Sequence, residues 1–129
     1  MAAGDCQRSV LIVEDDDDVR GALVAYLEAE GYSVLEAADG ADALRVLRGG
    51  TVCLVLLDLW MPNMNGWEFR AAQAKEPALA DVPVVVISAD HAAAKKAATL
   101  GVVASMTKPV ELPQLLDYVA RYCVPAGTA

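Results

Sequence analysis

Five polar side chains that could take part in a reaction lie at the ends of apolar runs in this 129-residue chain. Asp58 directly follows one such run, Glu14 and Asp15 follow a second, Ser88 ends a third, and Lys108 lies just beyond a fourth. If these runs are strands of one parallel sheet, their carboxyl ends share an edge, where sheets of this kind bind ligands. Three carboxylates, a hydroxyl and an amine would meet there. This set suits a carboxylate that accepts a phosphoryl group beside a divalent cation.

Apolar runs alternate with stretches of helical spacing along the chain, which predicts five strand–helix units. The expected strands are residues 9–13, 33–37, 52–57, 83–87 and 101–106. The expected helices are residues 19–30, 40–48, 66–75, 91–100 and 111–121. This alternation predicts an α/β fold, with one five-stranded parallel sheet covered by helices on both faces.

Length and composition bound the fold and exclude some functions. With 56% hydrophobic residues, the chain fits one compact domain, which we assign to residues 8–122 with terminal tails at 1–7 and 123–129. A net charge of −8 argues against direct binding of nucleic acid. The N-terminus lacks an apolar signal core, and no apolar stretch is long enough to span a bilayer. We therefore expect a cytoplasmic protein without membrane insertion.

The three cysteines are Cys6, Cys53 and Cys123. Because they are odd in number, widely spaced and not arranged as metal ligands, we predict free thiols. Cys53 lies within an apolar run and is expected to be a small buried side chain rather than a redox group.

Five successive acidic residues, 14–18, stand between the first expected strand and helix. Such a run is electrostatically costly without a counter-charge, so a cation should lie nearby. Residues 16–18 are expected to cap the helix and favour the positive end of its dipole. Glu14 and Asp15 lie at the strand end itself. Together with Asp58 they would form an oxygen-rich pocket suited to a hydrated magnesium ion.

Four motifs coincide with the strand ends: VLIVEDD at 10–16, LLDLWMPNMNG at 56–66, VISA at 86–89 and TKP at 107–109. In this order, placement and spacing they resemble the receiver domain of two-component response regulators. The resemblance covers about residues 8 to 122. It implies a flavodoxin-like strand order of 2-1-3-4-5, Mg²⁺ as cofactor, and a sensor histidine kinase or histidine phosphotransfer protein as the phosphoryl donor.

Carried over to this sequence, the resemblance makes Asp58 the phosphoacceptor. Asp15 would bind Mg²⁺ together with Asp58 and the backbone carbonyl of Trp60, while Glu14 would act through a metal-bound water. The chain would catalyse only its own phosphorylation and dephosphorylation, and would not otherwise be an enzyme.

The same resemblance gives the remaining positions their roles. Lys108 would pair with Asp58 before transfer and with a phosphoryl oxygen afterwards, and the Lys108–Pro109 bond would be cis. Ser88 would donate a hydrogen bond to the phosphoryl group, and Ala89 would leave room beside it. Phosphorylation would alter a docking surface formed by the fourth helix, the last strand and the last helix.

Two positions depart from the common pattern of the family. Ser105 stands where many members carry tyrosine or phenylalanine, an aromatic that swings inward on activation, so the usual two-state switch is in doubt. Trp60 is bulky and follows the acceptor by two residues, and our hypothesis is that it slows hydrolysis of the acyl phosphate. The only histidine, His91, is expected to be a helix-start residue rather than a phosphorelay group.

Several alternatives use a similar topology. An FMN-binding flavodoxin needs a hydroxyl- and glycine-rich phosphate loop where this chain has five acids. A phosphatase of the haloacid dehalogenase type needs an aspartate at the position of Trp60, and no cap segment is present. Two further possibilities stay open: a receiver that docks proteins without being phosphorylated, and a receiver excised from a hybrid kinase or multidomain regulator.

Overall fold

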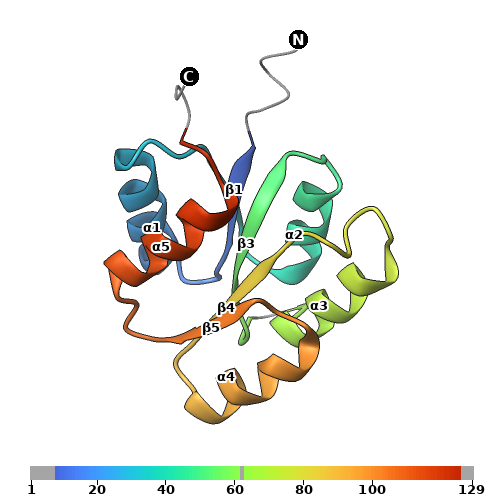
Figure 1. Cartoon of the computed structure of the whole chain (residues 1–129). Coiled ribbons are helices and arrows are strands. Elements are labelled where there is room, and N and C mark those ends of the chain that lie inside the picture. The colour runs from blue at the N-terminus through green and yellow to red at the C-terminus, as the bar shows by residue number, and fades with distance from the viewer. Residues whose placement is uncertain (1–7, 62, 126–129) are drawn as a thin grey trace.

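Five strands alternate with five α-helices in the computed structural model, which describes residues 8–61 and 63–125 (Figure 1). The strands are β1 (Ser9–Val13), β2 (Val34–Ala37), β3 (Val52–Asp58), β4 (Val84–Ser88) and β5 (Ala104–Thr107). The helices are α1 (Asp17–Ala29), α2 (Gly40–Leu47), α3 (Gly66–Lys75), α4 (His91–Ala97) and α5 (Leu112–Tyr122), with a 3₁₀ turn η2 (Ala98–Leu100) after α4. Within the described ranges, no helix is both long and apolar enough to cross a membrane.

All neighbouring strands pair in parallel, in the order β2-β1-β3-β4-β5. Helices cover both faces of the sheet, so the predicted fold class and the strand order implied by the resemblance are confirmed. One face packs against α2, α3 and α4, through side chains such as Leu44, Phe69 and Ala97. The other packs against α1 and α5, through side chains such as Leu27, Leu115 and Val119.

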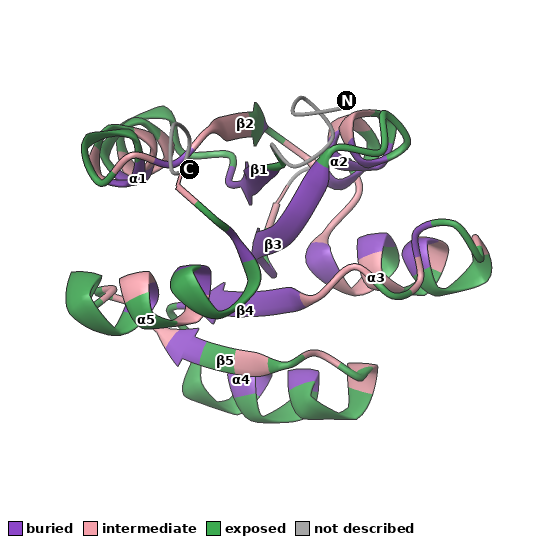
Figure 2. Ribbon diagram, turned by 45° about the horizontal axis from the view of Figure 1, so that its top comes forward, coloured by how far each residue is buried: buried purple, intermediate pink, exposed green. Residues whose placement is uncertain are grey.

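The three central strands are buried along their whole length, as their purple colour in Figure 2 shows. A strand covered by helices on both faces has no solvent side, which explains why these segments are continuous apolar runs rather than alternating ones. The edge strands β2 and β5 are only partly buried. The buried centre of the sheet therefore ends at predicted site residues: Glu14 directly follows β1, Asp58 ends β3 and Ser88 ends β4.

The segment after β4 differs most from the predicted bounds. The helix expected over 91–100 ends at Ala97 and continues as the 3₁₀ turn to Leu100. Gly101 follows with a φ of 75°, a left-handed conformation that ends helices and favours glycine. Because Gly101 belongs to this turn, β5 begins at Ala104 rather than at residue 101.

Cys53 and Cys123 form a disulfide bond, so the prediction of free thiols is wrong for this pair. Cys53 is buried near the start of β3, and Cys123 is buried directly after α5. The two are 70 residues apart in sequence, but the return of α5 over the sheet brings their Cα atoms to 5.5 Å. Sequence spacing carries no trace of this approach. Cys6 lies outside the described residues.

We predict that reducing the Cys53–Cys123 bond lowers the free energy of unfolding by about 2–4 kcal/mol, because the bond restricts a long loop of the unfolded chain. Urea unfolding of oxidised and reduced protein would measure the difference. A variant with both Cys53→Ala and Cys123→Ala is the control, since reductant should leave its stability unchanged. If unfolded, unreduced protein titrates with three free thiols, the bond is absent.

Candidate functional site

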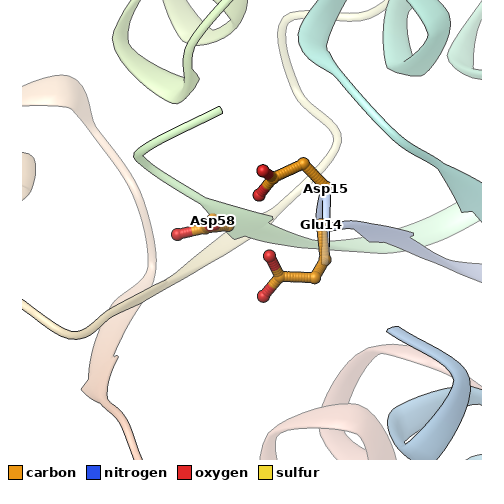
Figure 3. A group of neighbouring side chains, drawn as sticks. All are labelled: Glu14, Asp15 and Asp58. Carbon is orange, nitrogen blue, oxygen red and sulfur yellow. The ribbon is translucent and has the colours of Figure 1, made fainter. Parts of the chain in front are cut away.

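Three carboxylates converge at the carboxyl edge of the sheet, as Figure 3 shows. Asp58 is the last residue of β3, and Glu14 and Asp15 directly follow β1. Their ligand oxygens all lie within 4.8 Å of one another, close enough to hold one metal ion. Glu14 and Asp58 are buried, whereas Asp15 is exposed. The predicted acidic cluster is therefore assembled, with one side open to solvent.

Strand register and a helix cap put the first two acids in place. Val13 of β1 lies opposite Leu57 of β3, so the residues that follow them, Glu14 and Asp58, end neighbouring strands side by side. The chain then turns away, because Asp16 caps α1 by accepting from the backbone N–H groups of residues 18 and 19, at 2.9 and 3.1 Å. The capping role predicted for Asp16 is confirmed. Asp16 thus caps a helix, whereas Glu14 and Asp15 before it belong to the acidic cluster.

The loop after Asp58 folds tightly back onto it. The backbone N–H of Trp60 points at Asp58 Oδ1 from 3.4 Å, and that of Gly66 donates to Leu59 O at 2.9 Å. A Cβ atom on Gly66 would lie 2.8 Å from Asp58 O, so only glycine allows this close approach. The loop is also attached to α2, where Gly40 N–H donates to a loop carbonyl, that of Met64, at 2.9 Å.

Lys108 reaches the acidic cluster from the loop after β5, but its closest partner is not the predicted one. Its Nζ lies 2.6 Å from Glu14 Oε1 and 3.8 Å from Asp58 Oδ2. The predicted pairing with Asp58 is therefore the longer of two contacts. The Lys108–Pro109 bond is cis, as expected from the resemblance. The backbone N–H of Lys108 donates to Ser88 O at 2.9 Å and joins the two strand ends.

The charges at the site are unevenly distributed. The pKa of Asp58 is raised to about 7, and burial is the main cause. The hydrogen bond with Glu14 and the negative charge of Glu14 also contribute to this rise. Burial alone would raise the pKa of Glu14, but hydrogen bonds from Lys108 and Asp58 outweigh burial and lower it. Burial would lower the pKa of Lys108, but Glu14 and Asp58 raise it. Burial and the neighbouring Glu14 raise the pKa of Asp15. At neutral pH the ion pair is thus Lys108–Glu14, while Asp58 is partly protonated.

Ser88 and Trp60, the predicted hydroxyl and bulky residue, both lie towards the turn between β4 and α4. Ser88 is fully buried at the end of β4, and its Oγ accepts from Asp90 N–H at 3.1 Å. Ala89 beside it is exposed. Trp60 is 53% exposed and, with Trp67 and the start of α4, lines a hollow of about 380 Å³.

Two predicted positions lie away from the carboxylates. Ser105 is exposed on edge strand β5, opposite Val86 of β4. His91 is the first residue of α4 and is exposed, as expected for a helix-start residue.

Arg20 of α1 is a site residue that the motifs did not reveal. Its guanidinium donates to Glu14 O at 2.7 Å, to Glu36 Oε1 at 3.0 Å and to Asp17. The run of five acids signalled that a cation was needed, but Glu36 is far along the chain and nothing in the sequence identified Arg20 as that cation.

Comparison with known proteins agrees with the family resemblance of the sequence motifs. A family model described as the response regulator receiver domain matches residues 10–120. The CAI-1 autoinducer sensor kinase/phosphatase CqsS of Vibrio cholerae is 30% identical over 119 residues, which are 90% of this chain and 17% of CqsS. The transcriptional regulatory protein GlrR of Escherichia coli is 37% identical over 123 residues, 91% of this chain and 27% of GlrR. This chain spans less than a third of the length of both.

Solved structures agree over the whole fold. A response regulator receiver protein from Pseudomonas putida has a TM-score of 0.83 at 29% identity, covering 94% of this chain and 99% of that chain. The chemotaxis response regulator CheY4 of Vibrio cholerae has a TM-score of 0.80 at 26% identity, covering 89% and 98%. With its strand order and the acids at its sheet edge, this chain belongs to the receiver domain family of two-component response regulators.

Proposed function

We propose that the chain accepts a phosphoryl group on Asp58 from a phosphohistidine of a sensor histidine kinase or phosphotransfer protein. The observation that carries this proposal is the convergence of the Glu14, Asp15 and Asp58 carboxylates beside the amine of Lys108. A carboxylate oxygen of Asp58 attacks phosphorus, the bond from phosphorus to the histidine nitrogen breaks, and an acyl phosphate forms.

The donor chemistry of the cluster fits Mg²⁺. Magnesium prefers oxygen ligands and usually keeps several waters, which suits a site with one exposed and two buried carboxylates. Asp15, Asp58 and the Trp60 carbonyl are the proposed direct ligands, and Glu14 acts through a water. When bound, the ion supplies positive charge to phosphoryl oxygens that would otherwise be repelled by the carboxylates.

Two further side chains are placed to contact the phosphoryl group. Lys108 Nζ is 3.8 Å from Asp58, so a small movement away from Glu14 would bring the amine to a phosphoryl oxygen. Ser88 Oγ already accepts from a backbone N–H, which leaves its own proton free to donate. Ala89 beside it adds little bulk.

The output we propose is a changed docking surface on α4, β5 and α5. In support, Ser88 and Lys108 come directly from the ends of β4 and β5, and Lys95 and Lys96 of α4 are exposed nearby. Because Ser105 is small and exposed, the signal does not depend on an aromatic side chain at that position. The domain bounds of 8–122 belong to the same proposal.

We also propose a cytoplasmic location. Disulfides are rare in the cytosol, so Cys53 and Cys123 would be reduced there for much of the time. Helix α5 would then be held to the sheet by apolar contacts such as those of Leu115 and Val119.

Incubation with a small phosphodonor and Mg²⁺ should add one phosphoryl group to the protein, measured by intact mass and mapped to Asp58. Asp58→Asn and chelation of the metal should each abolish the gain, because one removes the nucleophile and the other the neutralising charge. Asp81→Asn, the same change at an exposed residue, should leave it intact. No gain in the parent protein, with partner binding kept in Asp58→Asn, would favour a docking module that is never phosphorylated.

The raised pKa of Asp58 predicts how stability depends on pH without metal. Ionising this buried carboxyl beside Glu14 destabilises the folded state, so its contribution to stability is lost as pH rises through about 7. Asp58→Asn should therefore melt at least about 4 °C above the parent at pH 8.5 in chelator, and the gap should shrink towards pH 5.5. Scanning calorimetry of both proteins and of Asp81→Asn measures this. A gap that is constant with pH would contradict it.

Trp60 follows the acceptor by two residues, and our hypothesis is that its exposed indole hinders the approach of attacking water. Removing the indole should then speed hydrolysis of the acyl phosphate about threefold or more. Loss of phosphorylated protein after removal of the donor gives the rate. Trp60→Phe keeps most of the bulk and should stay near the parent rate. An unchanged rate in Trp60→Ala would rule out this role.

A further inference from the structure

Arg20 joins three separate segments at the base of the acidic cluster. Its side chain is 16% exposed, and its guanidinium contacts the carbonyl of Glu14, the carboxylate of Glu36 on β2 and the carboxylate of Asp17 on α1. The backbone N–H of Arg20 also donates to Asp16 O, at 2.9 Å. A planar guanidinium has donors pointing in several fixed directions, so it can hold such a set where a lysine amine could not.

The contact with the Glu14 carbonyl has a consequence for the neighbouring residue. That carbonyl belongs to the peptide that links Glu14 to Asp15, so holding it fixes the plane of this peptide. Together with the φ angle of Asp15, this plane sets the direction in which the Asp15 side chain leaves the backbone. Asp15 is exposed and has little packing of its own to orient it, so this peptide is its main constraint.

Arg20 pairs with acids beside the cluster rather than with the three carboxylates of the cluster. Its side chain pairs with Asp17 and Glu36, which are not among the three converging carboxylates. Among the described residues it forms no hydrogen bond or ion pair with the carboxylates of Glu14, Asp15 or Asp58. Arg20 therefore neutralises neighbouring acids without occupying the oxygens that a metal would need.

We propose that Arg20 is a positioning residue of the metal site, which aims the carboxylates of Glu14 and Asp15 at Asp58 by holding the peptide between the first two. This inference rests on the Mg²⁺ site proposed above. It adds a residue that touches neither the metal nor the phosphoryl group.

Positioning and simple charge predict opposite effects when Arg20 is replaced. Removing a cation near an anionic site should strengthen Mg²⁺ binding if only Coulomb interactions matter. Releasing the peptide between Glu14 and Asp15 should weaken binding, because the ligands lose their preorganised geometry. The sign of the change therefore separates the two roles.

The experiment is a titration with Mg²⁺ alone, followed by calorimetry and by the fluorescence of Trp60 in a Trp67→Phe background. Arg20→Gln should raise the Kd for Mg²⁺ about tenfold, as loss of an outer contact to a metal ligand typically does. The matched control is Arg45→Gln. It removes the same charge from an exposed arginine whose contact, 2.6 Å to Asp42, lies within α2. It should bind Mg²⁺ as the parent does or slightly more tightly.

A second measurement distinguishes positioning from a general loss of structure. A merely structural role would lower the Tm of Arg20→Gln equally with and without Mg²⁺, whereas positioning also reduces the increase in Tm that Mg²⁺ produces. If Arg20→Gln does not fold, Arg20→Lys takes its place. It keeps the charge but not the three-way contact, and it should still bind Mg²⁺ more weakly than the parent.

The outcomes that overturn the proposal are distinct from those that overturn the metal site. If Arg20→Gln, or Arg20→Lys where the former is unfolded, binds Mg²⁺ as tightly as the parent or more tightly, Arg20 does not position the ligands. If the parent protein shows neither heat nor a fluorescence change with Mg²⁺, the metal site itself is wrong.

Discussion

Repulsion among the carboxylates at one end of the sheet is the constraint on which the rest of the site depends. Glu14 and Asp58 are buried within reach of each other and of Asp15, where like charges are expensive. The protein reduces this cost in three ways: Lys108 pairs with Glu14, Asp58 keeps its proton up to about neutral pH, and Arg20 neutralises the acids around them. A divalent cation would relieve the repulsion that remains. A cation bound among these carboxylates would therefore also stabilise the fold.

The buried centre of the sheet makes this arrangement possible. Strands β1 and β3 are buried along their entire length, and their register fixes Glu14 beside Asp58. Of the groups proposed to contact the phosphoryl oxygens, Ser88 ends the buried strand β4, whereas Lys108 follows the partly buried edge strand β5. The proposed nucleophile, Asp58, is thus attached to a strand that is buried along its whole length. Lys108, by contrast, follows an edge strand that solvent can reach.

Much of the fold and the acidic cluster could be predicted, because both depend on local patterns. Buried apolar runs gave the strands, and the polar residue that ends each run lies at the shared edge. What could not be predicted depends on approaches between distant segments. The bond between Cys53 and Cys123 requires the return of α5 over β3, and the contact between Arg20 and Glu36 requires the pairing of β1 with β2. Lys108 Nζ lies closer to Glu14 than to Asp58, at 2.6 Å against 3.8 Å, and no sequence motif encodes so small a difference in distance.

The two cations at the site have chemistries that match different tasks. Lys108 carries a compact charge on a flexible stem, and its ammonium can exchange one oxygen partner for another without a fixed direction of approach. Such a group can leave Glu14 when a metal or a phosphoryl group arrives. Arg20 binds three partners through a rigid fork, so leaving any one of them would disrupt the others. An arginine in place of Lys108 would resist the exchange that phosphoryl transfer needs. A lysine in place of Arg20 could not hold the peptide that orients Asp15. A lysine thus stands where the contact would have to change during phosphoryl transfer, and an arginine stands where the contacts would have to stay the same.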